Sequence, residues 1–288
     1  MTPQSGAKTA RRPKRATAAK PISVDSARSF VEGVKLPRAR RTRDAASPMR
    51  TRGAAAAPIP MVEQIFDQTK NQAAVVGSEV VSFVQGVTAE RRDAIVNSSL
   101  LAQLVAKQKV SDPNRIYDWY DAYFDVLTNI GWVVQDKSFA VYHESSQNFE
   151  AHKAIIAVAT TLLGAAPTAL ALVASALKAL ESMNESSPWI TVFSRESQNA
   201  KTARFQISLA EQDAAGQFFV SLMAFGLEAK SSITQVLFFK AKANDATLRH
   251  YAGRVTINTN VLDGISESIK AKLSGHASDY IKALPDLN

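Results

Sequence analysis

Apolar residues recur along this chain with two different periods, and the change of period divides the sequence into a helical part and a strand-like part. The first part predicts helices over residues 61–85, 88–109 and 112–129. Thr88 is a suitable N-cap for the second helix, and Gly131 is a suitable stop after the third. A short strand is expected to follow over residues 132–142, where β-branched and aromatic residues are enriched.

The central stretch, residues 151–183, is the most apolar part of the sequence and predicts a helical hairpin. Its first arm covers 151–163, and Gly164 to Pro167 form the turn, because glycine commonly ends a helix and proline commonly opens one. The second arm covers 168–183. Arms of this length reach roughly 20 and 24 Å, less than the ~30 Å of a bilayer's hydrocarbon core.

After the hairpin the period changes to two, which predicts an antiparallel meander of about five strands. The expected strands cover residues 189–194, 204–209, 217–227, 233–243 and 247–258. A helix capped by Asn260 and a last short helix before Pro285 are expected to close the sheet. The predicted fold is therefore α+β: a helical N-terminal half with a central apolar helical hairpin, packed on the sheet.

Charge separates the first 60 residues from the rest. Residues 1–60 hold 14 Lys and Arg and three acids, a net charge of +11, whereas the remainder carries −3. Apolar residues are sparse in this segment, so residues 1–60 are expected to be a disordered basic tail and residues 61–288 a single α+β domain. The stretch 26–36 is an exception, because Phe30, Val31 and Val34 can line one face of a short helix.

The basic tail is the candidate site for binding a polyanion. Clustered cations attract nucleic acid or anionic lipid without sequence specificity, and aromatic residues for base stacking are not interleaved with them. The alternatives are a solvated tail, a targeting address or a loading leader. The candidate residues are Arg11, Arg12, Lys14, Arg15, Arg38, Arg40, Arg41 and Arg43.

The apolar hairpin has three possible packing partners: the rest of the chain, a protein partner or second copy, and a membrane. In composition it resembles the concealed apolar hairpin of colicin-type pore-forming proteins. The second arm has a polar side, formed by Ser175, Lys178 and Glu181, which suits a helix at a protein surface. Packing within the chain is therefore the favoured interpretation.

Other candidate residues are better explained by structure than by chemistry. Asp118, Asp121 and Asp125 share one helix face, which indicates a solvated surface rather than a metal site or a dock for the tail. Aromatic residues at helical spacing on that helix indicate core rather than a ligand cleft. They are Tyr117, Trp119, Tyr120, Tyr123 and Phe124.

Catalytic motifs are weak in this sequence. His143 and His152 do not have the spacing of a zinc-binding HExxH helix. Ser175 and Lys178 match the SxxK of serine acyl-enzymes, but Lys201-Thr202 is followed by Ala203 rather than glycine. We find no GxGxxG, P-loop or GxSxG pattern, and we predict no catalytic residue, metal or cofactor.

The absence of cysteine excludes disulfides, thiolate metal ligands and thiol nucleophiles. Because no apolar run opens the sequence, we expect a cytoplasmic protein or one exported without a cleavable secretory signal. The favoured function is a non-catalytic interaction protein whose tail contacts an anionic partner. The alternatives are a membrane-active effector that exposes the hairpin and an enzyme whose site leaves no local motif.

Overall fold

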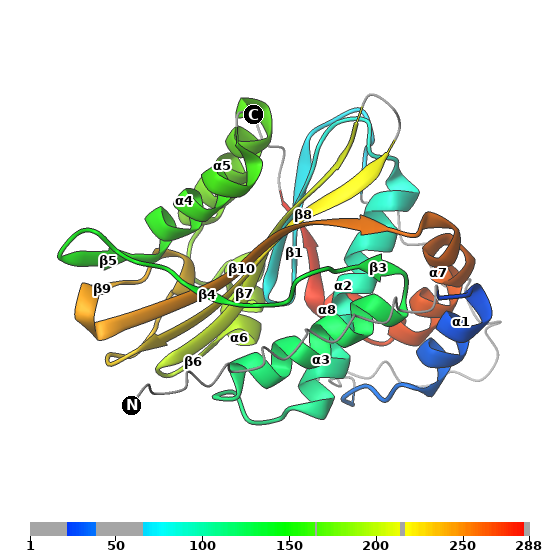
Figure 1. Cartoon of the computed structure of the whole chain (residues 1–288), viewed down its shortest axis with the longest axis horizontal. Helices are drawn as coiled ribbons and strands as arrows, with labels where there is room; N and C mark the ends of the chain where they lie inside the picture. Colours follow the sequence, from blue (N-terminus) through cyan, green and yellow to red (C-terminus); the bar gives the residue numbers. More distant parts are fainter. Residues whose placement is uncertain (1–21, 39–65, 165, 214–216, 285–288) are drawn as a thin grey trace, which may run out of the picture.

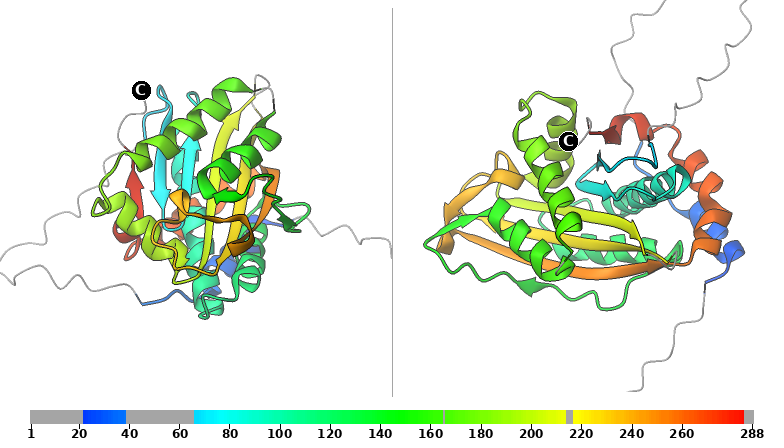
Figure 2. Two further views of the ribbon diagram at one scale, coloured as in Figure 1. Left: turned by 90° about the vertical axis from the view of Figure 1, so that its left-hand side faces the viewer. Right: turned by 90° about the horizontal axis from the view of Figure 1, so that it is seen from above.

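A mixed, mostly antiparallel sheet separates two layers of helices (Figures 1 and 2). The computed structural model describes residues 22–38, 66–164, 166–213 and 217–284. Within them, nine strands form the main sheet in the order β11-β1-β2-β7-β8-β10-β3, with β4 beside β10 and β6 beside β7. The pair β2–β7 is parallel, and the remaining pairs are antiparallel. The strands are β1 (Gln72–Val76), β2 (Glu79–Phe83), β3 (Trp132–Val133), β4 (Ala140–Val141), β6 (Gln198–Asn199), β7 (Thr202–Gln212), β8 (Phe218–Ala229), β10 (Ala246–Ile257) and β11 (Ile281–Ala283).

The two faces of the sheet are covered by different sets of helices. One face of the sheet carries α1 (Val24–Gly33), α2 (Ala89–Lys109), α3 (Ile116–Asn129), α7 (Thr259–Leu273) and α8 (Ala277–Tyr280). The other carries α4 (Ala151–Leu163), α5 (Pro167–Glu181), α6 (Pro188–Ser197) and the 3-10 turn η1 (Val236–Phe238). A second small sheet pairs β5 (Asn148–Glu150) with β9 (Lys240–Lys242), and the 3-10 turn η2 (Ala243–Asp245) follows β9.

Alternate residues of the central strands contribute to two separate cores. In β1, Ala74 and Val76 pack toward α2, whereas Ala73 and Val75 pack into the core on the opposite face, where α6 contacts β1. Both faces are therefore buried, and the alternation of apolar and polar residues that marks a half-buried strand disappears. For this reason the prediction of a helix over residues 61–85 is wrong, since residues 72–83 are the strands β1 and β2.

Gly77 sits in the turn between these two strands. Val76 pairs with Glu79, so Gly77 and Ser78 form a two-residue hairpin loop. Gly77 has φ +56°, a conformation that favours glycine in such loops. Gly77 is therefore part of a strand turn, and the N-terminal half of the chain supplies two strands of the sheet.

Two further segments differ from the prediction. Residues 189–194 are helical and belong to α6, because the Ser187 hydroxyl accepts a hydrogen bond from the Ile190 N–H and Pro188 occupies the first turn. Residues 233–243 hold η1 and β9 instead of a long strand. After α8 the chain returns to the sheet as the edge strand β11, so helices do not close the sheet and it has nine strands rather than five.

The α+β class and several elements are confirmed. Helix α2 begins after the Thr88 cap, and its end at Lys109 matches the prediction. The hairpin helices also match, with the first arm at Ala151–Leu163 and Pro167 opening the second. The strands predicted over 204–209, 217–227 and 247–258 are the central parts of β7, β8 and β10.

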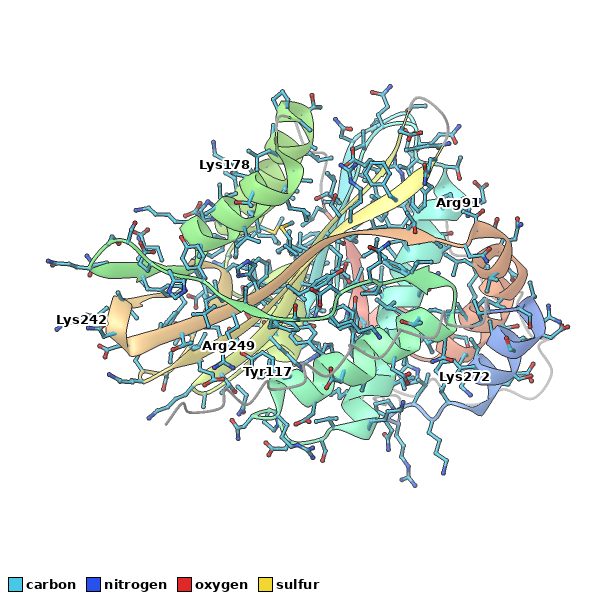
Figure 3. The ribbon with its side chains drawn as sticks, viewed as in Figure 1. Arg91, Tyr117, Lys178, Lys242, Arg249 and Lys272 are labelled. Atoms are coloured by element: carbon cyan, nitrogen blue, oxygen red, sulfur yellow. The ribbon has the colours of Figure 1, made fainter. Side chains whose placement is uncertain are left out.

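The helix α1 lies inside the segment that was expected to be a disordered tail. Ser23 and Ser26 form a capping box, and Ala27 and Val31 are buried. Helix α1 packs against α7, where the Lys272 ammonium donates to the Glu32 carbonyl oxygen at 2.8 Å (Figure 3). The stretch 26–36, named above as an exception to disorder, therefore overlaps a helix that packs within the chain, and the rest of 1–60, apart from 22–38, lies outside the described residues.

Candidate functional site

The α4–α5 hairpin is the candidate site, because it is the most apolar part of the chain and covers one face of the sheet beside α6 (Figures 1 and 2). Gly164 ends α4 with φ +58°, where a side chain would be strained, and Pro167 opens α5 with its φ already suited to a helix. At the base of the hairpin, the Ala151 N–H donates to the Phe239 carbonyl oxygen at 2.9 Å. The His152 ring lies on Phe238, with 5.9 Å between ring centroids.

The inner side of the hairpin packs on the sheet through apolar side chains. Helix α4 contacts β8, β10 and η1, whereas α5 contacts β2 and β7. The core between hairpin and sheet includes Ile155 and Leu177 from the helices and Phe205 and Phe225 from the strands, all fully buried. The two phenylalanine rings stack with centroids 4.9 Å apart, which gives the hairpin a flat aromatic base.

Polar contacts do not attach this hairpin to the sheet. Within the described residues, the side chains from Ala154 to Ser182 form no hydrogen bond or ion pair with a residue outside the hairpin. The hydroxyls of Thr160, Thr161 and Ser182 donate to carbonyl oxygens of their own helices. Beyond the Ala151 N–H bond at its base, the attachment of the hairpin is therefore apolar packing together with its two chain connections.

The opposite layer is attached by buried polar contacts. The Gln103 amide nitrogen on α2 donates to the Val76 carbonyl oxygen at 2.9 Å, and its amide oxygen accepts from the Ser78 N–H at 2.9 Å. The Tyr120 hydroxyl on α3 lies 2.8 Å from the Phe225 carbonyl oxygen. Separating α2 and α3 from the sheet would leave these groups unpaired, a cost that separating α4 and α5 does not carry.

The outer side of the hairpin is weakly polar and carries little charge. No charged residue lies between Lys153 and Lys178. The exposed positions in that interval are small or hydroxylated: Ala157, Thr160, Thr161, Ala166, Pro167, Thr168 and Ala171. Lys178 projects from the outer side of α5 (Figure 3). The hairpin therefore combines an apolar inner face with an outer face whose dehydration costs little free energy.

A groove of about 320 Å³ runs along one side of the hairpin, where α4 borders β10. Its lining is Tyr142, Ala157, Val158, Thr161, Leu162, His250 and Ala252. Burial lowers the pKa of His250, so its ring is neutral at neutral pH and the groove lacks a charged side chain. Tyr142 and His250 lie far apart in sequence and belong to no local motif, which is why sequence reasoning missed this groove.

The acidic face and the aromatic residues of α3 have structural roles. Asp118 and Asp125 are exposed and form ion pairs with Arg115 and Lys109 at 2.9 and 3.2 Å, and Asp121 is also exposed. This agrees with a solvated face, and docking of the tail on it stays untested. The aromatic side chains fill the core beneath the sheet, apart from the half-buried Tyr117. They are Trp119, Tyr120, Tyr123 and Phe124.

The remaining sequence candidates are not brought together. His143 is exposed beyond β4, and His152 lies at the base of α4. Within the described residues there is no cluster of three or more His, Asp or Glu that would suit a metal ion. Ser175 lies in the middle of α5. Of the proposed polyanion-binding residues the structure describes Arg38, which is exposed after α1, and the other seven lie outside the described residues.

Comparison with known proteins gives no family. No family model matches the chain, and no curated protein matches it. Among solved structures it is similar to a delta-endotoxin at 14% identity and a TM-score of 0.31, covering 77% of this chain and 97% of that one. It is also similar to the Evf virulence factor at 11% identity and a TM-score of 0.30, covering 73% of this chain and 82% of that one. Likenesses this distant leave the function to be argued from the chain itself.

The length of the hairpin helices limits how they can meet a bilayer. In the described part of the chain, no helix combines the length and the apolar character needed to cross a membrane. With 13 and 15 residues, α4 and α5 extend about 20 and 22 Å, against ~30 Å for a hydrocarbon core. A hairpin of these arms is long enough to pass the midplane from one side and too short to reach the other interface.

Proposed function

We propose that this protein is membrane-active, and that the α4–α5 hairpin leaves the sheet to enter lipid. The observation that carries the proposal is the apolar attachment of the hairpin. Between Ala154 and Ser182, no side-chain hydrogen bond or ion pair ties the described residues of the hairpin to the rest of the molecule. No charge lies between Lys153 and Lys178.

Release of the hairpin would replace its apolar contacts in the protein with apolar contacts in lipid. On release, the inner face of the hairpin trades apolar contacts with the sheet for apolar contacts with acyl chains. Its backbone hydrogen bonds stay within the two helices, as lipid requires. The sheet face that it leaves is apolar, and a second copy of the chain or lipid would have to cover it. A homo-oligomer through that vacated face would meet this need, and contact with a protein partner or second copy through residues 151–183 themselves is the alternative proposal.

A charge placed near the tip of the hairpin tests this proposal. Thr168 is exposed in the first turn of α5, where a carboxylate also suits the helix dipole, so Thr168→Asp should fold as well as the native chain. In the inserted hairpin the same carboxylate would enter the hydrocarbon region. At a bilayer centre an Asp costs about 3 kcal/mol, which lowers membrane partitioning by roughly 100-fold.

Thr191→Asp is the matched control. Thr191 is exposed near the start of α6, a helix that also opens with proline but lies outside the hairpin. Dye leakage from vesicles of anionic and neutral lipid should be strongly reduced by Thr168→Asp, little changed by Thr168→Asn, and unchanged by Thr191→Asp. Equal leakage from the two Asp variants, or no leakage from the native chain at any pH and lipid composition, would refute hairpin insertion.

The basic N-terminal segment supports a second, compatible role. Its net charge of +11 favours contact with an anionic partner, either a membrane surface or nucleic acid. We propose that this contact brings the protein to an anionic surface, and it would also suffice for a non-catalytic interaction protein that never releases its hairpin. Cytoplasmic location, or export without a cleavable signal, remains part of this proposal.

A deletion that tests the basic N-terminal segment must leave α1 intact. Removing residues 1–60 would take away a helix that packs on α7, so a loss of binding would be ambiguous. Removing residues 1–21 deletes the cluster Arg11, Arg12, Lys14 and Arg15 and leaves α1 in place. Binding to anionic vesicles and to nucleic acid should weaken, with a shallower salt dependence. Equal binding and equal salt slopes for the two proteins would remove this cluster from the function.

A further inference from the structure

A polar cavity opens where β7 extends beyond its neighbour β2. The parallel pairing of the two strands covers Gln206 to Ala210 of β7, so the first residues of β7, from Thr202 onward, have no β2 beside them. The C-terminal end of α2 and the helix α6 border the space instead, together with the short strand β6. The cavity measures about 200 Å³, and its charged lining consists of Lys107, Arg195, Glu196 and Arg204.

Two of the three cations in this cavity already have a carboxylate partner. Glu196 accepts from the Lys107 ammonium and from the Arg195 Nε–H, each at 2.7 Å. Burial by itself would raise the pKa of Glu196, but the two cations outweigh it and lower the pKa. Glu196 is therefore ionised at neutral pH, and the cavity retains an excess of positive charge.

Arg204 is the cation that forms no ion pair within the described residues, although Glu196 attracts it from a greater distance. Its guanidinium lies over the Trp119 ring at 4.7 Å and forms no hydrogen bond with any described residue. Its Nε atom is buried. Burial lowers the pKa of Arg204, yet a guanidinium stays protonated in proteins. A planar fork of N–H donors thus lines the cavity with its hydrogen-bonding capacity unused.

Two more buried donors lie in this part of the molecule. Ser197 is 2% exposed and lines the cavity, and its hydroxyl has no hydrogen-bond partner in the described part of the chain. The Trp119 indole N–H is also buried without a partner there. Trp119 lies under the Arg204 guanidinium and lines a separate pocket of about 10 Å³ rather than the cavity itself. Buried donors are costly unless an acceptor pairs with them, so the unpaired Arg204 Nε and Ser197 hydroxyl at this cavity indicate an acceptor-rich ligand.

We propose that this cavity binds a phosphate-type oxyanion, either free or as the head of a phosphomonoester, through Arg204 and Ser197, with Trp119 supporting the Arg204 guanidinium. The guanidinium fork matches the geometry of phosphate oxygens. The cavity is smaller than the ~300 Å³ at which sites for drug-sized ligands begin, which suits a small anion. The site is independent of the hairpin and stands or falls separately from membrane activity.

The three tryptophans provide a residue-specific readout. The indole N–H of Trp189 already donates to the Ala283 carbonyl oxygen, whereas those of Trp119 and Trp132 are buried without a partner among the described residues. Inorganic phosphate is titrated into the full chain while the indole N–H resonances are followed by NMR, with Trp119→Phe assigning the signal. Phosphate should shift the Trp119 signal saturably, with a dissociation constant at or below about 1 mM. Phosphate bound by the basic N-terminal segment would leave this signal in place.

Substitutions distinguish phosphate binding in this cavity from a general attraction of phosphate to positive charge. Arg204→Gln should weaken phosphate binding at least tenfold, and Ser197→Ala about fivefold, as expected for one hydrogen bond. Arg254→Gln is the matched control, because Arg254 also lies over an aromatic ring, that of Phe219 at 4.2 Å, on the opposite face of the sheet. If Arg204→Gln fails to fold, Ser197→Ala carries the test alone.

These titrations test whether the cavity binds phosphate, and they distinguish a lipid headgroup from a free anion. A Trp119 signal that phosphate does not move, equal weakening by Arg204→Gln and Arg254→Gln, or tighter binding of acetate than of phosphate would overturn the site. Vesicles containing phosphatidic acid distinguish the two sources of the anion. Competition between the vesicles and phosphate at the Trp119 signal indicates a lipid headgroup, and binding of phosphate without competition indicates a free anion.

Discussion

Glu79 is a buried acid whose removal should change how stability depends on pH. It lies on β2, 1% exposed, between the sheet and α2. Its two carboxyl oxygens are hydrogen-bonded by the hydroxyls of Ser99 on α2 and Ser208 on β7. Burial raises the pKa of Glu79, and these hydroxyls oppose the shift only in part. The titratable neighbour on α3 is Tyr123, whose own pKa burial raises well above its ordinary value.

The direction in which stability changes with pH follows from the different proton affinity of Glu79 in the folded and the unfolded chain. Above pH 4.5, the ordinary pKa of a glutamate, the unfolded chain loses this proton whereas the folded chain keeps it. The stability that Glu79 contributes is therefore fully present below that pH and is lost as pH rises toward the folded-state pKa. The slope for one proton is about 1.4 kcal/mol per pH unit, and it ends when pH reaches the folded-state value.

Glu79→Gln should abolish this slope, because the amide has nearly the same shape and does not ionise. Urea denaturation of the native chain and the variant, at several pH values between about 4 and 9, gives the free energy of unfolding of each. We expect the two proteins to have similar free energies of unfolding near pH 4. As pH rises, the free energy of unfolding of Glu79→Gln should exceed that of the native chain by about 1.4 kcal/mol more for each pH unit. Parallel profiles for the two proteins above pH 4.5 would refute the idea that Glu79 is protonated in the folded state.

Three further substitutions test the packing. Arg92→Met should cost about 3 kcal/mol or more in urea denaturation, because Arg92 is fully buried and donates to several backbone carbonyl oxygens. Leu177→Ala should cost about 2–5 kcal/mol by the same measurement and should increase vesicle leakage, since it weakens the contact between α5 and the sheet. Gly264→Leu should detach α1, because an added Cβ would lie 2.8 Å from a Val24 methyl carbon; faster proteolysis within residues 22–38 would show it, and unchanged cleavage would contradict it.

The sequence predicted the elements that show a single clear pattern. The hairpin was predictable from its glycine–proline turn, and β7 from its alternation after Arg204. It did not reveal β1 and β2, because both faces of these strands are covered and their residues do not alternate between apolar and polar. The polar positions of β7 were misleading in another way. Gln206 and Ser208 alternate like solvent-facing residues, yet both are buried: Gln206 hydrogen-bonds to Tyr120 on α3, and Ser208 hydrogen-bonds to Glu79 on β2.

The candidate sites depend on contacts that no local pattern encodes. The apolar composition of the hairpin was visible in the sequence, but the absence of polar contacts to the sheet depends on what faces it. The anion cavity joins Lys107 from α2, Glu196 from α6 and Arg204 from β7. These residues meet because β7 is longer than its pairing with β2, a consequence of register that only the folded chain displays.

The two helical layers should respond differently to the same conditions, and this difference joins the stability and membrane arguments. Glu79, Gln103 and Tyr120 connect the sheet to α2 and α3, so a rise in pH acts on that side of the molecule. On the other face, the titratable group of the described sheet residues beside α4 is His250, whose pKa burial lowers, so that it stays neutral as pH rises above neutrality. Glu79→Gln should therefore change the pH at which the whole protein unfolds. It should leave the leakage ratio between Thr168→Asp and Thr191→Asp unchanged, because that ratio reports the hairpin alone.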